Sequence, residues 1–228
     1  MLLSIHIPKT AGTNFTHILR RCFTKGLHLD YGTERDLTAA RTCDPSILND
    51  AITFEKSHCI IHGHYHYLKY KNIFSSEQVL VTMRHPVNRV ISQYRHIALN
   101  GDPRVERHRL IMEGKMDVLH FAKFPFIANA QSYYLEGIDI QNVDHIIVAE
   151  FFPESVTKFV CAIDRTDLQP EISKITDRKI NSREGDSWRT KAIPIMDGCE
   201  EEIERRCAID MDLYLRALDK EGYSSVRD

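Results

Sequence analysis

Four short, mainly apolar runs are spaced along the chain, and each is followed by a segment with a different pattern. The runs lie at 2–7, 59–61, 78–83 and 145–149. Apolar runs of this length are typical of strands that are buried on both faces, as in a parallel sheet. The run at 78–83, Gln-Val-Leu-Val-Thr-Met, is the clearest. The pattern therefore predicts four buried strands.

The segments between these runs carry apolar residues at three- and four-residue steps, which is the spacing of one helix face. The best example begins at Pro86, a residue suited to the first turn of a helix, and continues through Val87, Val90, Ile91, Tyr94 and Ala98. Further helices are expected at about 15–23, 116–135, 153–163 and 197–218, and one near Asp44. The segment 101–115 is expected to be irregular, and 166–194 is polar with little periodicity.

Strands that alternate with helices predict an α/β fold with a mostly parallel central sheet flanked by helices. The chain has 228 residues, a length that one hydrophobic core can serve. Neither an internal repeat nor a linker divides it. We therefore expect a single domain over residues 1–228.

Composition narrows the classes of function. The formal net charge of -2 does not favour a nucleic acid partner, although a local basic pocket for one nucleotide stays open. No apolar run has the length of a membrane span, and the N-terminus lacks the pattern of a signal peptide. The six cysteines are scattered without a CxxC pair, as expected for buried thiols in a reducing compartment. These features predict a cytoplasmic protein without a membrane span.

The segment His6-Ile7-Pro8-Lys9-Thr10-Ala11-Gly12-Thr13-Asn14-Phe15 joins the first predicted strand to a helix. Small residues let the backbone wrap around an anion, and the first turn of a helix offers it unpaired N–H groups. Lys9 adds positive charge where negative charge develops during group transfer. The loop is P-loop-like without being a Walker A motif, because its lysine precedes the glycine instead of following it. A glycine-containing turn with a surface lysine is the alternative interpretation.

A second segment, 81–94, ends a predicted strand with Arg84 and places Ser92 two turns into the next helix. The order Pro-Lys-Thr-x-Gly-Thr resembles the 5′-phosphosulfate loop of sulfotransferases that use 3′-phosphoadenosine 5′-phosphosulfate (PAPS), and 81–94 resembles their 3′-phosphate element. The resemblance implies that Arg84 gives the 3′-phosphate a forked, charge-assisted contact and that Ser92 donates its hydroxyl. It also implies that the 5′ end of PAPS is bound by Lys9, Thr10, Ala11, Gly12, Thr13 and Asn14.

A third segment, His62-Gly63-His64-Tyr65, follows the second predicted strand. It resembles the His-Gly-His segment of the heparan sulfate and uronyl 2-O-sulfotransferases and their bacterial relatives, in which a histidine is the catalytic base. On this resemblance His64 is the expected base, with His62 as a supporting or alternative base. An unperturbed histidine pKa of about 6.5 suits proton transfer near neutral pH.

The resemblance also reaches a late basic segment, 177–182, where related enzymes close a loop over the nucleotide. Arg178 is therefore expected to help bind the 3′-phosphate, with a solvated run of charges as the alternative. The activity implied is in-line transfer of a sulfuryl group from PAPS to a hydroxyl acceptor, with a carbohydrate or glycolipid expected. No metal is expected, because no carboxylate pair or Cys/His cluster stands out in the sequence. The oligomeric state stays open.

Two other functions fit part of the pattern. A nucleotide or small-molecule kinase shares the strand–loop–helix start, since a fold alone does not fix the chemistry. Against it stands the position of the lysine: a Walker A lysine follows the last glycine and is itself followed by Ser or Thr that holds Mg²⁺, whereas Lys9 precedes Gly12. A non-catalytic nucleotide-binding protein is the second alternative. The joint presence of Lys9, His64, Arg84 and Ser92 favours an enzyme over it.

Overall fold

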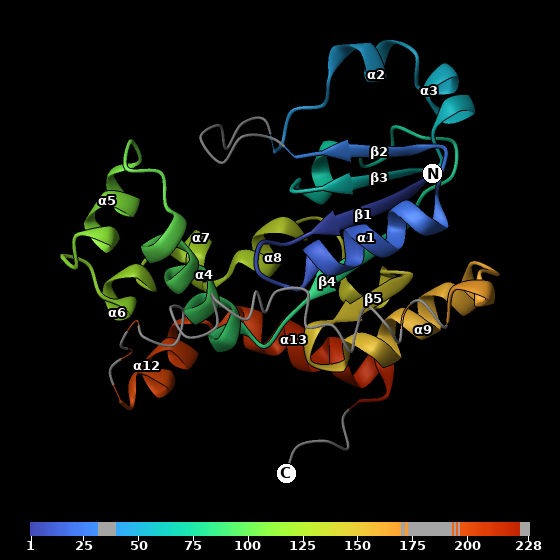
Figure 1. The fold of residues 1–228 in the computed structure, drawn as a ribbon. Coiled ribbons are helices and arrows are strands. Elements are labelled where there is room, and N and C mark those ends of the chain that lie inside the picture. Colours follow the sequence, from blue (N-terminus) through green and yellow to red (C-terminus); the bar gives the residue numbers. More distant parts are fainter. Residues whose placement is uncertain (32–39, 170–171, 173–192, 194, 196, 224–228) are drawn as a thin grey trace.

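Five parallel strands form one sheet in the order β2-β3-β1-β4-β5 in the computed structural model (Figure 1). The structure describes residues 1–31, 40–169, 172, 193, 195 and 197–223. The strands are β1 (Leu2–His6), β2 (Leu27–Asp30), β3 (Ile60–Gly63), β4 (Gln78–Met83) and β5 (His145–Val148). Because all neighbouring pairs are parallel, the carboxyl ends of the strands meet at one edge of the sheet.

The four strands predicted from apolar runs are confirmed, to within two residues at each end, whereas β2 was not predicted. Its sequence, Leu-His-Leu-Asp, alternates apolar and polar residues and is only partly buried. It pairs with β3 alone and lies at the edge of the sheet. An edge strand faces solvent on one side, so it lacks the continuous apolar run that marks the central strands.

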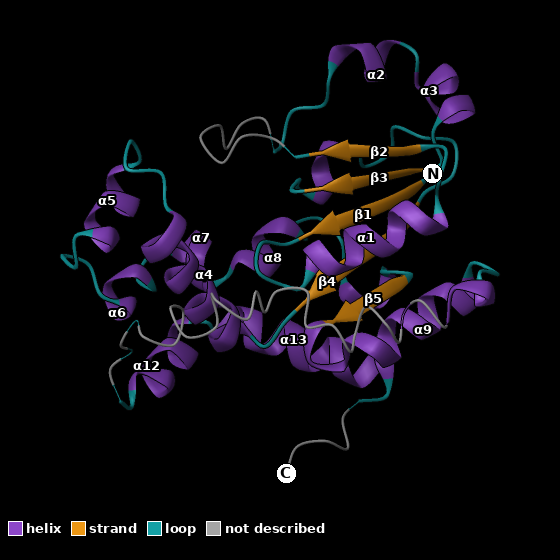
Figure 2. Cartoon of the chain, in the orientation of Figure 1, coloured by secondary structure: helices purple, strands orange, loops and turns teal. Residues whose placement is uncertain are grey.

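Helices cover both faces of the sheet (Figure 2). On one face α1 (Gly12–Cys22) and α9 (Phe152–Ala162) pack side chains such as Phe15 and Phe159 against Leu80 and Ile147 of the sheet. On the other face, α13 (Ala208–Glu221) packs Tyr214, Ala217 and Leu218 against the sheet. The strand residues on this face alternate along each strand with those that contact α1 and α9. Both faces of the central strands are therefore buried, as the apolar runs predict.

A third hydrophobic cluster lies beyond the carboxyl ends of the strands. It is built from α4 (Pro86–Asn100), α5 (Glu106–Met112), α6 (Val118–Phe121), α7 (Pro125–Ala128) and α12 (Cys199–Arg206). The expectation that 101–115 is irregular is wrong, because α5 buries His108 and Ile111 in this region. A helix of two turns with one main apolar anchor gives little periodicity, and its stability comes from packing on its neighbours.

The remaining described elements are short. They are α2 (Pro45–Asn49), α3 (Ala51–Ser57), α8 (Ala130–Tyr134) and the 3₁₀ turns η1 (Tyr67–Lys69), η2 (Ile140–Asn142), η3 (Ala149–Phe151) and η4 (Thr166–Leu168). The helix expected near Asp44 is confirmed as α2, whose Ser46 N–H donates to the Asp44 carboxylate. In the described part of the chain, no helix combines the length and apolarity needed to cross a bilayer.

Candidate functional site

The loop between β1 and α1 takes an unusual backbone path. Lys9 and Ala11 both have left-handed conformations, with φ of 72° and 66°. Helix α1 begins directly after this turn, and its first turn receives no side-chain cap. The N–H groups at the start of the helix are thus left for another acceptor, such as a phosphate.

Gly12 is required at the start of α1 by a close approach. A Cβ at this position would lie 1.7 Å from Nε2 of His6, far inside contact distance. The His6 imidazole therefore packs directly against the backbone of Gly12. This contact brings the end of β1 and the loop together.

Thr10 anchors the middle of the loop to the sheet. Its hydroxyl donates to the Ile7 carbonyl at 2.7 Å and lies 2.5 Å from the hydroxyl of Thr82, near the end of β4. The Thr10 side chain is therefore fully buried in these contacts, and Thr10 is not among the residues that line the cavity described below. Thr13 is exposed, and the buried Oδ1 of Asn14 has no hydrogen-bond partner among the described residues.

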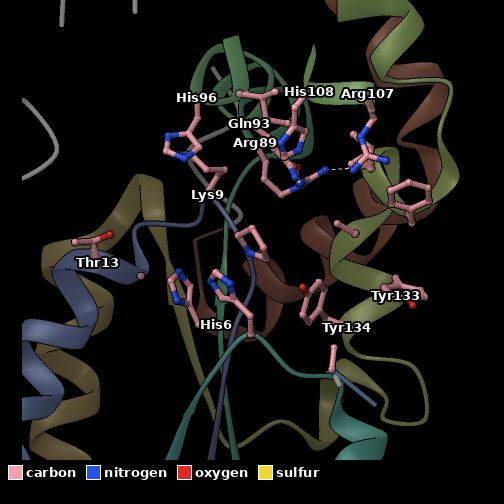
Figure 3. Close-up of a pocket in the computed structure, with 18 of the residues that line it drawn as sticks. His6, Lys9, Thr13, Arg89, Gln93, His96, Arg107, His108, Tyr133 and Tyr134 are labelled. Carbon is pink, nitrogen blue, oxygen red and sulfur yellow. Dashed lines mark hydrogen bonds between the residues drawn. The ribbon is translucent and has the colours of Figure 1, made fainter. Parts of the chain in front are cut away.

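A cavity of about 310 Å³ opens between this loop and the third hydrophobic cluster (Figure 3). The loop and the ends of β1 and β3 form one wall, to which His6, Lys9, Gly12, Thr13 and His64 belong. The opposite wall comes from α4, α5, α7 and α8, with Arg89, Gln93, His96, Arg107, His108, Phe126, Tyr133 and Tyr134. Lys9, Arg89 and Arg107 bring positive charge, and no Asp or Glu is among the described residues that line it. The cavity thus suits an anion.

His64 lines the cavity as a neutral imidazole. Burial lowers its pKa to about 4, with Asp30 opposing this shift and Lys9 adding to it. Its backbone N–H donates to the Asp30 carbonyl at 3.0 Å, and its Nε2 is buried without a hydrogen-bond partner among the described residues. A neutral histidine with an unused nitrogen is able to accept a proton.

His62 has different surroundings although it is only two residues away. Its side chain is fully buried, with Nδ1 2.8 Å from the Ser4 hydroxyl and Nε2 2.9 Å from the Thr16 hydroxyl. Burial and the nearby His64 lower its pKa to about 3. Since both ring nitrogens are engaged and the residue does not line the cavity, the geometry favours His64 over His62 as a base.

Arg84 joins the second motif to the first. Its Nη1 donates to the Lys9 carbonyl at 3.2 Å, and its Nε lies 3.9 Å from the Glu150 carboxylate. Burial lowers the pKa of its guanidinium. Neither Arg84 nor the half-buried Ser92 lines the cavity. Arg84 lies two residues before the first residue of α4. Arg178 lies outside the described residues.

Arg89 is the most buried charged residue of the far wall and was not predicted. Its guanidinium donates to the Gln93 side chain at 2.8 Å and to the Ile127 carbonyl. Burial lowers its pKa, while the negative charge of Asp210 opposes that shift. The signal in the sequence is the spacing of Arg89, Gln93 and His96, which places them along one face of α4.

Residues 1–125 match the sequence profile of the sulfotransferase family. The chain belongs to this family. The matched region contains the loop, the His-Gly-His segment and the Arg84 motif, and extends to the first residue of α7. No curated protein matches the chain.

Membership in the sulfotransferase family supports transfer of a sulfuryl group, with a hydroxyl as the general class of acceptor. The parallel sheet with helices on both faces agrees with that family. Among the described residues, no group of three or more His, Cys, Asp or Glu side chains is arranged to hold a metal ion, and this includes the neighbouring histidines His6, His62 and His64.

Proposed function

We propose that this sulfotransferase moves the sulfuryl group of PAPS to a hydroxyl acceptor, with His64 as the base. The observation that carries the proposal is that Lys9, the uncapped start of α1 and a neutral His64 all border one cavity. A cation, an anion-binding helix terminus and a proton acceptor are the parts that in-line transfer of an anionic group needs.

The loop supplies the groups for the 5′ end of PAPS. Backbone N–H groups of the loop and of the first turn of α1, from Thr10 to Asn14, are the proposed donors to the 5′-phosphate, since this turn has no side-chain cap. Lys9 is proposed to stabilise the oxygen that bridges sulfur and the 5′-phosphate. Arg84 and Ser92 are the proposed partners of the 3′-phosphate, with Arg178 as a further partner. The contact between Arg84 and the Lys9 carbonyl supports one continuous nucleotide site, because it links the two proposed phosphate positions.

His64 takes the proton of the acceptor hydroxyl as the acceptor oxygen bonds to sulfur. The bond from sulfur to the 5′-phosphate oxygen breaks in the same step, and adenosine 3′,5′-bisphosphate leaves with the bonding electron pair. Lys9 is placed to offset the negative charge that develops on this leaving oxygen. His62 stays neutral and supports the strand end through Ser4 and Thr16.

The far wall of the cavity supports a carbohydrate or glycoconjugate acceptor. Phe126, Tyr133 and Tyr134 offer apolar ring surface, while Gln93 and His108 offer polar atoms beside it. A binding site of this kind uses apolar surface for contact area and a few polar groups for orientation. A sugar ring, with apolar faces and hydroxyl edges, matches this division.

The decisive experiment is calorimetric titration with adenosine 3′,5′-bisphosphate, run beside ATP with Mg²⁺. We expect saturable binding of the bisphosphate, weakened at least tenfold in Arg84→Ala, because a charge-assisted hydrogen bond is worth about 1.5–3 kcal/mol. Arg205→Ala, which removes an exposed arginine of α12, is the control. Binding of ATP with Mg²⁺, together with no binding of the bisphosphate, would instead favour a kinase.

A second assay tests transfer itself. PAPS is incubated with a panel of methyl glycosides, and release of adenosine 3′,5′-bisphosphate is measured. Tight binding of the bisphosphate without release on any acceptor would favour the non-catalytic alternative.

A further inference from the structure

Four aromatic rings meet at the ends of β1, β2 and β3, around the proposed base. The His64 ring contacts the His6 ring edge-on, with centroids 4.4 Å apart, and the Tyr31 ring edge-on at 4.8 Å. The His6 ring also stacks on His62 at 5.4 Å. Since Nε2 of His64 has no hydrogen-bond partner among the described residues, ring packing is the main restraint on its orientation.

The hydroxyl of Thr16 determines where the hydrogen atoms in this cluster lie. It is 2.7 Å from the Gly12 carbonyl, which can only accept, so the single Thr16 hydroxyl proton is donated there. The Thr16 oxygen must therefore accept from its two other neighbours, His62 Nε2 at 2.9 Å and the Tyr31 hydroxyl at 3.1 Å.

The remaining hydrogen atoms follow from this. His62 carries its proton on Nε2, so its Nδ1 accepts from the Ser4 hydroxyl. The Tyr31 hydroxyl donates its proton to Thr16, so the Tyr31 oxygen accepts a hydrogen bond from Nδ1 of His6 at 2.9 Å. His6 is consequently the Nδ1–H tautomer, with Nε2 unprotonated.

The tautomer of His6 matters because its Nε2 edge packs on the loop. That edge occupies the place of a Cβ on Gly12, and a hydrogen on Nε2 would point into the Gly12 backbone. The unprotonated form lets the ring fit there. Burial and the nearby His64, His62 and Lys9 also lower the pKa of His6, which keeps the ring neutral.

We propose that Tyr31 is a positioning residue for the His64 base: its hydroxyl holds His6 in the Nδ1–H form, and the His6 and Tyr31 rings together orient the His64 imidazole at the cavity. This inference rests on the proposed function, because it assigns a role relative to the base. Tyr31 is 40% exposed, so its ring is not simply a core residue. Among the residues that the structure describes, Thr16 and His6 are the hydrogen-bond partners of its hydroxyl.

The first test reads the tautomers directly, in long-range ¹H–¹⁵N NMR spectra of the full chain labelled with ¹⁵N-histidine. We expect His6 to be protonated on Nδ1 in the wild-type protein and to shift toward the Nε2–H form in Tyr31→Phe. Signals are assigned with His6→Gln. Tyr94→Phe is the matched control, since it removes a hydroxyl that bonds the Met116 carbonyl away from the cluster. A wild-type His6 protonated on Nε2, or no change in Tyr31→Phe, overturns the proposal.

The second test separates positioning from folding. In the methyl glycoside assay, Tyr31→Phe should lower kcat about tenfold with less than a twofold change in KM for PAPS, because misplacing a base impairs the chemical step. Thr16→Val, which removes the Thr16 hydroxyl, should lower kcat by a similar factor. Thr16→Ser, which keeps the hydroxyl, should have the kcat of the wild-type protein. An unchanged kcat in Tyr31→Phe overturns the proposal. Failure of the proposed function would look different: wild-type protein would not bind adenosine 3′,5′-bisphosphate, while the tautomers remain readable.

Discussion

His64 and His62 illustrate how two neighbouring side chains of one type acquire separate roles. His62 is fully buried and bonded at both ring nitrogens, so a proton could join it only if one of these bonds broke. His64 is neutral and lines the cavity, and its Nε2 has no hydrogen-bond partner in the described part of the chain. The side chains differ in available hydrogen-bonding capacity, and that capacity determines which one suits a base.

Replacing His64 by alanine should abolish most turnover without abolishing nucleotide binding. Loss of a general base lowers rates by about 10²–10⁴-fold. We expect kcat to fall within that range, while the affinity for adenosine 3′,5′-bisphosphate in calorimetry changes less than threefold. His17→Ala, on the exposed side of α1, is the control. Wild-type turnover in His64→Ala would remove this residue from the mechanism.

The pH dependence of kcat/KM should show the lowered pKa of His64. A base must be deprotonated to act, and the acid limb of kcat/KM reports the pKa of the free enzyme. With a pKa of about 4, His64 remains deprotonated across the range from pH 8 to 5.5. We therefore expect kcat/KM to be flat there after correction for stability. A midpoint near 6.5 would indicate an unperturbed histidine instead.

The sequence indicated Lys9, His64 and Arg84 as candidate site residues because each belongs to a local motif. It did not indicate His6 as a neighbour of the proposed base, although His6 is the first residue of the loop segment. Its role depends on Tyr31 and His64, which reach it from β2 and β3. Arg89 was missed for a similar reason, since its position on the cavity follows from how α4 packs.

At the scale of elements, the strand–loop–helix start depends on one close contact. Gly12→Ala should displace either His6 or the loop, because the new Cβ would lie 1.7 Å from Nε2 of His6. Overpacking of this kind costs about 1–3 kcal/mol. We expect a loss of stability in that range by urea unfolding, together with at least tenfold weaker binding of the bisphosphate.

Gly114→Ala is the control for this loop variant. Gly114 also has a positive φ, 68°, but an added Cβ would meet nothing within 4 Å. It should lose about 1 kcal/mol through backbone strain and bind the bisphosphate normally. Equal binding by the Gly12 and Gly114 variants would contradict the role given to the close contact.

Strands and helices could be predicted from the sequence where their residues are fully buried, but not where they are only partly buried. Strand β4 was predicted with its observed limits because both faces of its central residues are covered. Strand β2 and helix α5 were missed, because a four-residue edge strand and a two-turn helix carry too few apolar positions to establish a period. Their stability comes from tertiary neighbours, which a local pattern does not contain.

At the scale of the whole molecule, several histidines are buried in neutral form. Burial lowers the pKa of His62 to about 3 and those of His64 and His66 to about 4. In the unfolded chain their pKa is about 6.5, so between pH 6.5 and 4 the unfolded state binds more protons. The contribution of these histidines to the free energy of unfolding is therefore fully present above pH 6.5 and decreases as the pH falls toward 4.

Urea unfolding at pH 7.5, 6.0 and 5.0 should reveal this dependence. The free energy of unfolding should decrease steadily below pH 6.5, by up to about 1.4 kcal/mol per pH unit for each histidine that titrates only when unfolded. His62→Gln should reduce the slope, whereas the exposed His17→Gln should not. A free energy that stays constant from pH 7.5 to 5.0 would show that these histidines bind protons equally in the folded and unfolded states, and so that burial does not lower their pKa.

Most of the far wall of the cavity belongs to a different hydrophobic cluster from the loop and the strand ends. The loop and the strand ends rest on the clusters that cover the sheet, whereas α4, α5 and α7 of the far wall belong to a cluster with α6 and α12. Only Tyr134 of α8, among the far-wall residues named above, packs against a cluster of the sheet. Substitutions in the far wall can therefore alter its shape with little strain on the sheet. In evolutionary terms, the wall proposed to meet the acceptor can diversify without disturbing the loop proposed to hold the donor, so this architecture allows one reaction to be directed to different molecules.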